Sequence, residues 1–315
     1  SPHHLAVAML HILETIVPVF LVILVGALVR RFGFLPGAVT VSLNRLVYYV
    51  AIPAMIFQAL ATASFSAQFR PEILLGTLVP VGLLFAAAIG IGRLLSIPRV
   101  EMGTFIQSSF HGNLGYIGFA VAFYLLGEDG FTRASILAGF LMLLQNLLSV
   151  VGLQLFSERR EGGARLGAAV KTVCGNPVIL SLLASVAFNL SGLPLPVIAG
   201  RTLKIVSGMA LPLALLVIGA SLSFGLVRTQ LRYVLPSALL KLGLLPAAGL
   251  LLFRLLGIPE SGFLPGFILL AAPTATVSYV MAVEMGGSPN QASAAVSMST
   301  LLSSATYVVW LGLLR

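Results

Sequence analysis

The chain has 315 residues, of which 58% are hydrophobic and only 9% carry a charge. Soluble domains carry roughly 25% charged residues. This composition, with a mean hydropathy of +1.07, excludes a soluble enzyme, a nucleic-acid-binding protein and a disordered chain. The net charge of +9 is instead assigned to basic loops at a membrane surface. We therefore expect a polytopic membrane protein that lies in the lipid bilayer and has no nucleic-acid partner.

Ten apolar stretches, separated by turn and charge signals, approach the roughly 20 residues that an α-helix needs to cross a bilayer. They are 11–30, 40–61, 72–95, 103–126, 132–156, 175–191, 198–222, 230–256, 262–285 and 291–314. The runs lack the alternation of a transmembrane β-barrel. The sequence therefore predicts an all-α protein with one half at 1–156, a linker at 157–174 and a second half at 175–315.

Basic residues gather on one set of alternate connections and predict the orientation of the chain. Arg30, Arg31, Arg99, Arg159 and Arg160 belong to this more basic side. Because Lys and Arg are enriched in cytoplasmic loops, we expect loop 157–171 in the cytoplasm. Both termini are then expected outside the inner (plasma) membrane.

The two halves of the chain resemble each other. Pro18 and Pro53 recur as Pro177 and Pro212, each 159 positions later. The longer match pairs Arg93-Leu-Leu-Ser-Ile-Pro98 with Arg254-Leu-Leu-Gly-Ile-Pro259. Such ordered matches indicate an internal duplication. Since each half holds five expected spans, an odd number, the second half would cross the membrane in the opposite sense. Inverted repeats of this kind underlie alternating access in secondary transporters; duplication for stability alone is the alternative.

The fourth and ninth spans are expected to be broken helices. One contains His111-Gly-Asn-Leu-Gly-Tyr-Ile-Gly118, and the other contains Ala271-Ala-Pro-Thr-Ala-Thr-Val-Ser-Tyr279. Proline removes a backbone donor, and glycine costs about 1 kcal/mol relative to alanine within a helix. Breaks at corresponding places in the two halves point to a binding site, because half-helix N-termini attract anions. The alternative is a kink or a glycine packing face.

A few polar residues lie within the expected spans. Lys241 is either functional, as buried charges in membranes usually are, or directed by snorkelling towards the cytoplasmic end. Gln145 and Asn146 are able to bind a substrate or another helix, and His111 either titrates or packs as a neutral imidazole. No Asp or Glu falls clearly within a span, so a coupling carboxylate is not evident. Enzyme motifs are absent from the sequence, and we expect no catalytic residue, metal site or cofactor.

Several short motifs together resemble the auxin efflux carrier family, which includes plant auxin exporters and many bacterial permeases. They are Ile16-Val17-Pro18-Val19, Leu43-Asn44-Arg45-Leu46-Val47, Ala51-Ile52-Pro53, Gly112-Asn113 with Gly118, Leu144-Gln145, Asn176-Pro177, Ala272-Pro273-Thr274-Ala275 and Met285-Gly286-Gly287. The resemblance covers essentially the whole chain and is closest to the bacterial members.

The resemblance implies a ten-helix inverted repeat, similar to sodium/proton antiporters and bile-acid symporters. Its scaffold domain would comprise the first, second, sixth and seventh spans, and its transport domain the third to fifth and eighth to tenth. It also implies a homodimer and an anionic substrate, usually a carboxylate. Asn113 and Pro273 would lie at the crossover of the broken helices, Gln145 would face the substrate, and Asn44 and Arg45 would line the second span. The chain lacks the carboxylate that plant exporters carry in the third span, so a proton or sodium as coupling ion is left open.

These observations favour a secondary carrier of small organic anions, either auxin-like carboxylates or dicarboxylates, that works by an elevator mechanism. The expected substrate-binding residues are Asn113, Gly115, Gln145, Pro273, Thr274, Thr276, Asn44, Arg45 and Lys241. One alternative is a sodium- or proton-coupled symporter of a larger amphipathic anion. Another is a membrane receptor that keeps the fold without transporting.

Overall fold

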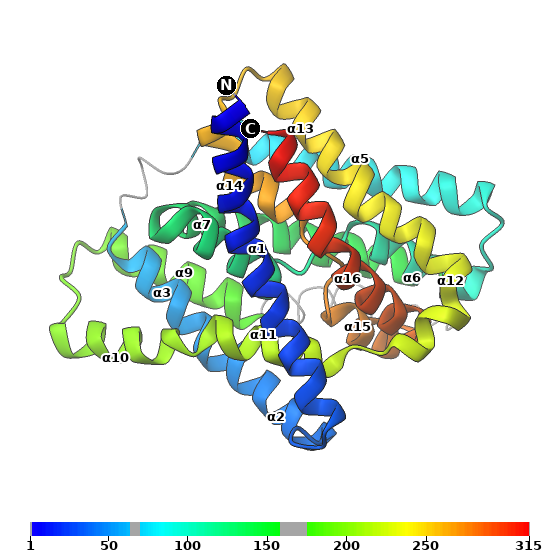
Figure 1. Ribbon diagram of the computed structural model, residues 1–315, viewed down its shortest axis with the longest axis horizontal. Coiled ribbons are helices and arrows are strands. Elements are labelled where there is room, and N and C mark those ends of the chain that lie inside the picture. The colour runs from blue at the N-terminus through cyan, green and yellow to red at the C-terminus, as the bar shows by residue number, and fades with distance from the viewer. Residues whose placement is uncertain (1, 64–69, 158–174, 315) are drawn as a thin grey trace.

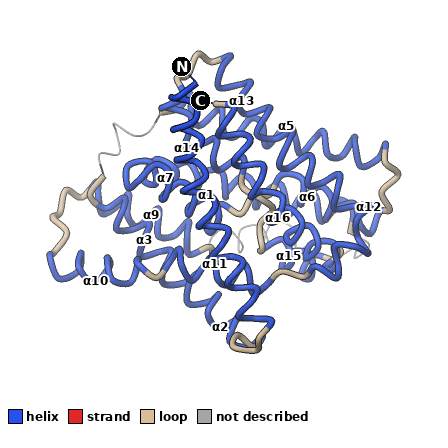
Figure 2. Tube along the Cα trace, viewed as in Figure 1, coloured by secondary structure: helices blue, strands red, loops and turns tan. Residues whose placement is uncertain are grey.

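The computed structural model describes residues 2–63, 70–157 and 175–314, with the side chains of residues 2–6 and 8 left out. All of the regular secondary structure in these ranges is helical (Figure 2). The helices are α1 (Pro2–Arg31), α2 (Gly37–Leu46), η1 (Val47–Ala51), α3 (Ile52–Ala61), α5 (Pro71–Leu94), α6 (Arg99–Phe110), η2 (Leu114–Gly118), α7 (Phe119–Phe156), α9 (Pro177–Leu190), α10 (Val197–Gly208), α11 (Ala210–Ser221), α12 (Phe224–Leu239), η3 (Leu240–Leu244), α13 (Leu245–Leu255), α14 (Glu260–Ala271), α15 (Val277–Met285) and α16 (Pro289–Leu313). Apart from Ser157, the expected linker lies outside the described residues.

Seven helical stretches of the described chain are long and apolar enough to cross a membrane. They are Met9–Arg31, Gly37–Ala61, Pro71–Leu94, Leu114–Phe156, Val197–Ser221, Phe224–Leu255 and Pro289–Leu313. The helices Pro177–Leu190 and Glu260–Ala271 are apolar but shorter. Helix is found in each of the ten ranges expected from the sequence. The protein is therefore a multi-pass helical membrane protein, while the number of ten spans stays a prediction.

The longest of these stretches contains a sharp kink. Leu114–Phe156 has 43 residues and would extend about 65 Å as one straight helix, roughly twice the hydrocarbon thickness of a bilayer. At Gly127 the backbone leaves helical geometry, with φ 71° and ψ −166°. This break falls between the ranges 103–126 and 132–156, where the sequence predicts a turn.

Two of the expected spans are irregular close to a proline. The π-helical turn η1 ends two residues before Pro53, and a second helix, α11, starts two residues before Pro212. A proline ring clashes with the carbonyl group four residues earlier, so the preceding turn must widen or open. The same arrangement recurs in α13, where η3 ends two residues before Pro246.

The two copies of the Arg-Leu-Leu-x-Ile-Pro motif fold alike. In the first copy, the amides of Ser96 and Ile97 donate to the carbonyls of Arg93 and Gly92, at 3.0 and 2.9 Å. In the second copy, Gly257 and Ile258 donate to Arg254 and Phe253, both at 3.0 Å. The left-handed residues also correspond, with φ 52° at Ser96 and φ 65° at Gly257. The two matching sequences therefore form the same kind of helix end.

The contacts between helices divide them into two groups, and the two groups meet at the middle of the molecule (Figure 1). In one group α1 packs against α11, and α3 packs against α9 and α10. In the other, α5, α6, α7 and α12 to α16 pack against one another. Large apolar side chains are exposed on the outside, such as Leu83 (62%) and Leu183 (59%). In a membrane protein these side chains face lipid.

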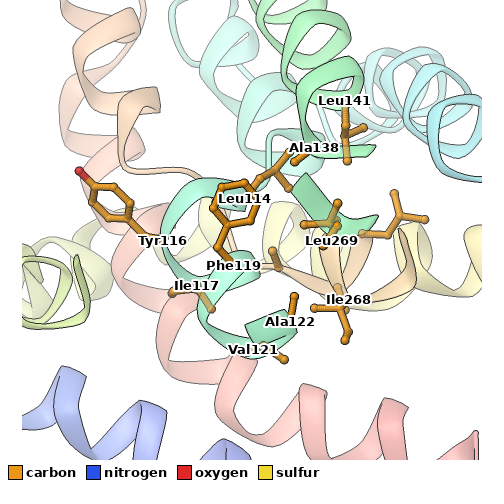
Figure 3. Packing of buried hydrophobic residues seen from close by; sticks show 14 of the residues in the cluster. Leu114, Tyr116, Ile117, Phe119, Val121, Ala122, Ala138, Leu141, Ile268 and Leu269 are labelled. Carbon is orange, nitrogen blue, oxygen red and sulfur yellow. The ribbon is translucent and has the colours of Figure 1, made fainter. Parts of the chain in front are cut away.

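The buried core includes the chain around η2. Figure 3 shows Leu114 and Phe119 of this segment close to Leu269 of α14, while the Tyr116 side chain points away from the cluster. The apolar contacts hold η2 against α14, and they leave the Tyr116 hydroxyl free to bond outside the cluster.

Candidate functional site

The breaks in the fourth and ninth expected spans lie against each other. Helix α6 ends at Phe110 and α14 ends at Ala271, and each is followed by a short non-helical segment. The Asn113 amide donates to the Pro273 carbonyl at 2.7 Å, and the Ala275 amide donates to the His111 carbonyl at 2.9 Å. These bonds form one antiparallel bridge between residues 111–113 and 273–275. We call the segments 111–113 and 272–276, with their contacts, the junction.

Gln145 satisfies backbone groups of the first break. Its side-chain oxygen accepts from the Gly112 amide, and its nitrogen donates to the Phe110 carbonyl, both at 3.2 Å. The Gln145 side chain is fully buried in α7. Buried backbone groups in the membrane must find partners within the protein, so the glutamine stabilises the broken end of α6. The structure thus places Gln145 at the junction, and its role as a substrate ligand stays a prediction.

Thr274 links the second break to two other helices. Its hydroxyl donates to the Ser108 carbonyl of α6, and its amide donates to the Ser299 hydroxyl of α16, both at 3.0 Å. The side chain is 1% exposed. Pro273, one residue earlier, accepts the hydrogen bond from Asn113. Pro273 and Thr274 therefore both take part in hydrogen bonds at the junction.

Lys241 is fully buried beside the junction, so the snorkelling alternative is wrong. Its ammonium group donates to the Leu270 carbonyl, near the end of α14, at 2.8 Å. A Cβ atom on Gly112 would lie 3.3 Å from the same nitrogen, so the lysine reaches both breaks. The π-helical turn η3 carries Lys241, and the packing of α14 and α6 around it leaves no path to the surface.

Asn113 is one of the residues at the junction with unused hydrogen-bonding capacity. Its side chain is 5% exposed, and its amide nitrogen Nδ2 has no hydrogen-bond partner among the described residues. Asn113 directly precedes η2, where helical N–H groups and the positive end of the dipole attract anions. The hydroxyl of Ser278, at the start of α15, is also buried without a partner in the described chain.

His111 is packed within the protein rather than open to solvent. The imidazole is 4% exposed, and its Nδ1 lies 2.9 Å from the Ser149 hydroxyl of α7. This placement agrees with the packed alternative for His111.

The other expected site residues lie at the edge of the junction, beyond it or at the surface. Gly115 lies in η2, and Thr276 is half-buried at the start of α15. Asn44 is an exposed residue of α2 and accepts a hydrogen bond of 2.7 Å from the Tyr116 hydroxyl. Arg45, its neighbour, is exposed on α2. The structure therefore links Asn44 to the junction through Tyr116 and leaves Arg45 at the surface.

Three residues of the site are absent from the set predicted from the sequence: Tyr116, Ser149 and Ser299. The sequence offered a signal for Ser299 only. It lies in a run of small polar residues in α16, among them Ser297, Thr300 and Ser303. In membranes, small and hydroxyl-bearing residues mark helix contacts.

Comparison with known proteins identifies the family. A family described as membrane transport protein matches residues 11–170 and 165–311. The chain is 27% identical over 317 residues to a protein of Rhizobium meliloti named "Putative malonate transporter", covering 98% of this chain and 97% of that protein. It is 28% identical over 305 residues to an "Uncharacterized transporter" of Methanothermobacter thermautotrophicus, covering 94% and 96% of the two chains. With nearly its whole length matched, the chain belongs to the membrane transport protein family, the family of the auxin efflux carriers.

Proposed function

We propose that this chain is a secondary transporter of small organic anions that binds the carboxylate of its substrate at the junction. Family membership supports transport rather than an enzymatic activity. The relative named as a malonate transporter favours a small dicarboxylate over a larger amphipathic anion or a receptor role.

The unpartnered amide nitrogen of Asn113 carries this proposal. A buried polar group without a partner is costly, and one at a helix N-terminus suits an anionic ligand. A substrate carboxylate would accept a hydrogen bond from Asn113 and from amides of the first turn of η2. Gln145 and Thr274 would hold the two breaks in place, since their side chains already bond to the backbone there.

The transport mechanism we propose is an elevator movement between two inverted five-helix repeats. The proposed scaffold comprises α1, α2, α3, α9, α10 and α11, and the proposed transport domain comprises α5 to α7 and α12 to α16. The two groups of contacts support this division. The matching helix ends at Ser96 and Gly257 support the repeat. In this arrangement the two broken helices cross at the junction and move with the substrate.

The proposed setting is a homodimer with ten spans per chain in the plasma membrane. Both termini would lie outside and loop 157–171 in the cytoplasm, following the distribution of Lys and Arg. The start of α1 and the end of α16 lie at the same end of the molecule (Figure 1), as an even number of spans requires.

Purified protein in liposomes tests the proposal by exchange of labelled malonate and labelled indole-acetate. We expect malonate to exchange, and Asn113→Ala to weaken its apparent affinity about tenfold, because a hydrogen bond to a charged group contributes about 1.5–3 kcal/mol. The matched control is Asn290→Ala, at an exposed position in the first turn of α16.

Two results would contradict the proposal. If neither anion exchanges or accumulates, the carrier function is lost. If a folded Asn113→Ala protein keeps its affinity, Asn113 is not a substrate ligand.

A further inference from the structure

The cation at the junction is part of the protein itself. The Lys241 ammonium is fully buried and donates to the Leu270 carbonyl at 2.8 Å. It also lies beside Gly112, where a side chain of any size would meet it at 3.3 Å. One ammonium group therefore contacts the last turn of α14 and the break that follows α6.

This position has a negative potential. The carbonyl groups at a helix C-terminus carry the negative end of the helix dipole, which favours a cation. In transporters with broken helices, such C-terminal ends and unwound carbonyls coordinate the coupling sodium ion or proton. Lys241 here makes the contact that a bound cation would make.

The two halves differ in how they satisfy these helix ends. At the end of α6 the Phe110 carbonyl accepts from neutral Gln145 at 3.2 Å. At the end of α14 the Leu270 carbonyl, 160 positions later, accepts from the charged Lys241. The protein thus supplies one positive charge, in one half only.

A second cation would have no acidic partner at this place. None of the Asp and Glu side chains in the described part of the chain is buried. A sodium ion next to Lys241 would be repelled by the ammonium group, and at 4 Å two unit charges interact by about 4 kcal/mol at an effective dielectric constant of 20.

We propose that Lys241 occupies the position of a coupling cation, so that anion transport by this chain requires no sodium. The statement about transport rests on the proposed function. The statement that Lys241 occupies a cation position does not depend on it. The lysine ammonium fills this helix end in place of a soluble cation, and it provides positive potential to an anion bound at the N-terminus of η2. Lys241 is then a positioning residue for the site rather than a direct ligand.

The first experiment measures thermal unfolding of the purified protein in sodium chloride and in N-methylglucamine chloride at equal ionic strength. We expect the wild-type melting temperature to be the same in both salts. Lys241→Met should lower it by roughly 5 °C, because the Leu270 carbonyl loses its partner. Lys204→Met, at an exposed position of α10, is the matched control and should leave it unchanged.

The wild-type comparison needs no variant, so it decides the proposal even where Lys241→Met does not fold. A melting temperature that rises specifically with sodium would overturn it. So would a Lys241→Met protein that keeps the wild-type melting temperature in both salts. The thermal unfolding experiment uses no substrate. It therefore separates a failure of this inference from a failure of the proposed function.

The second experiment measures malonate exchange in liposomes with sodium or N-methylglucamine as the only cation. We expect equal exchange rates in the two salts for the wild type. Lys241→Met should lower the exchange rate at least about tenfold, because the positive charge beside the anion is removed. Exchange that stops without sodium would contradict the proposal. An absence of malonate exchange in both salts would instead count against the proposed function.

Discussion

Individual side chains complete the hydrogen bonds that the broken helices leave open. At the end of α6, Gln145 and Thr274 donate to the carbonyls of Phe110 and Ser108. In lipid each unsatisfied backbone group costs several kcal/mol. Polar side chains in the middle of this protein are therefore structural requirements of the breaks as well as candidate ligands. Asn113 combines an amide nitrogen without a partner in the described chain with a position directly before η2.

The first prediction concerns Thr274. Thr274→Val keeps the side-chain shape but leaves the Ser108 carbonyl without a donor, and should destabilise the protein by about 1–3 kcal/mol. Thermal unfolding in detergent measures the effect. The control is Thr202→Val, an exposed threonine of α10 that bonds only within its own helix. Equal melting temperatures for the two variants would show that the Thr274 bond contributes nothing.

The second prediction concerns the left-handed residue Ser96. Its φ of 52° strains any side chain other than glycine, and this conformation costs about 1–2 kcal/mol for an L-residue. Ser96→Gly should therefore raise the melting temperature. The reverse change in the other half, Gly257→Ser at φ 65°, should lower it. A destabilising Ser96→Gly would mean that the loop has another conformation.

At the scale of elements, α1 and α11 approach closely at two glycines. A Cβ atom on Gly219 would overlap the Ile23 carbonyl of α1, and one on Gly26 would overlap the Leu216 carbonyl of α11. Small residues let the backbones of membrane helices approach each other. This pair of helices is therefore fixed by backbone contact, which a larger residue would separate.

The third prediction follows from that contact. Gly219→Ala should destabilise the protein by about 1–3 kcal/mol, because the clash is with backbone and not with a flexible side chain. Gly90→Ala is the matched control, since a Cβ there meets nothing within 4 Å. Within a helix it should be neutral or stabilising by up to about 1 kcal/mol. The comparison fails if both variants unfold at the same temperature.

At the scale of the whole molecule, a hydrogen bond between described residues links the proposed moving and static parts. The Tyr116 hydroxyl, in η2, donates to Asn44 of α2 at 2.7 Å. An elevator movement must break this bond, because it would carry η2 past α2. The bond therefore stabilises the conformation described here relative to others.

The fourth prediction is that Tyr116→Phe raises the maximal rate of anion exchange with little change in affinity. Removing about 1 kcal/mol of stabilisation corresponds to about fivefold in rate. Initial rates over a series of malonate concentrations separate the two parameters. Tyr233→Phe, on α12, is the control. A changed affinity at constant maximal rate would place Tyr116 in the binding site instead.

Much of this architecture could be predicted from the sequence because its causes are local. Apolar runs determined where the helices lie, and Pro53, Pro212 and the Gly112 and Pro273 segments determined where they break. The helix end at 93–98 and its copy at 254–259 followed from the same residues in both halves. These features depend on the backbone preferences of a few neighbouring residues.

The partners across the breaks were decided by tertiary structure alone. Lys241 and Leu270 are neighbours only because α14 packs against η3, and Thr274 reaches Ser108 across 166 positions of the chain. For the same reason Arg45, although next to Asn44, is left at the surface. A charged side chain in an apolar run either reaches the membrane surface by snorkelling or is buried in the protein. The packing of other helices around Lys241 excludes snorkelling. The sequence by itself thus determined the helices and their breaks, while the fold determined which atoms satisfy the breaks and left the Asn113 amide nitrogen among the polar atoms without a partner in the described chain.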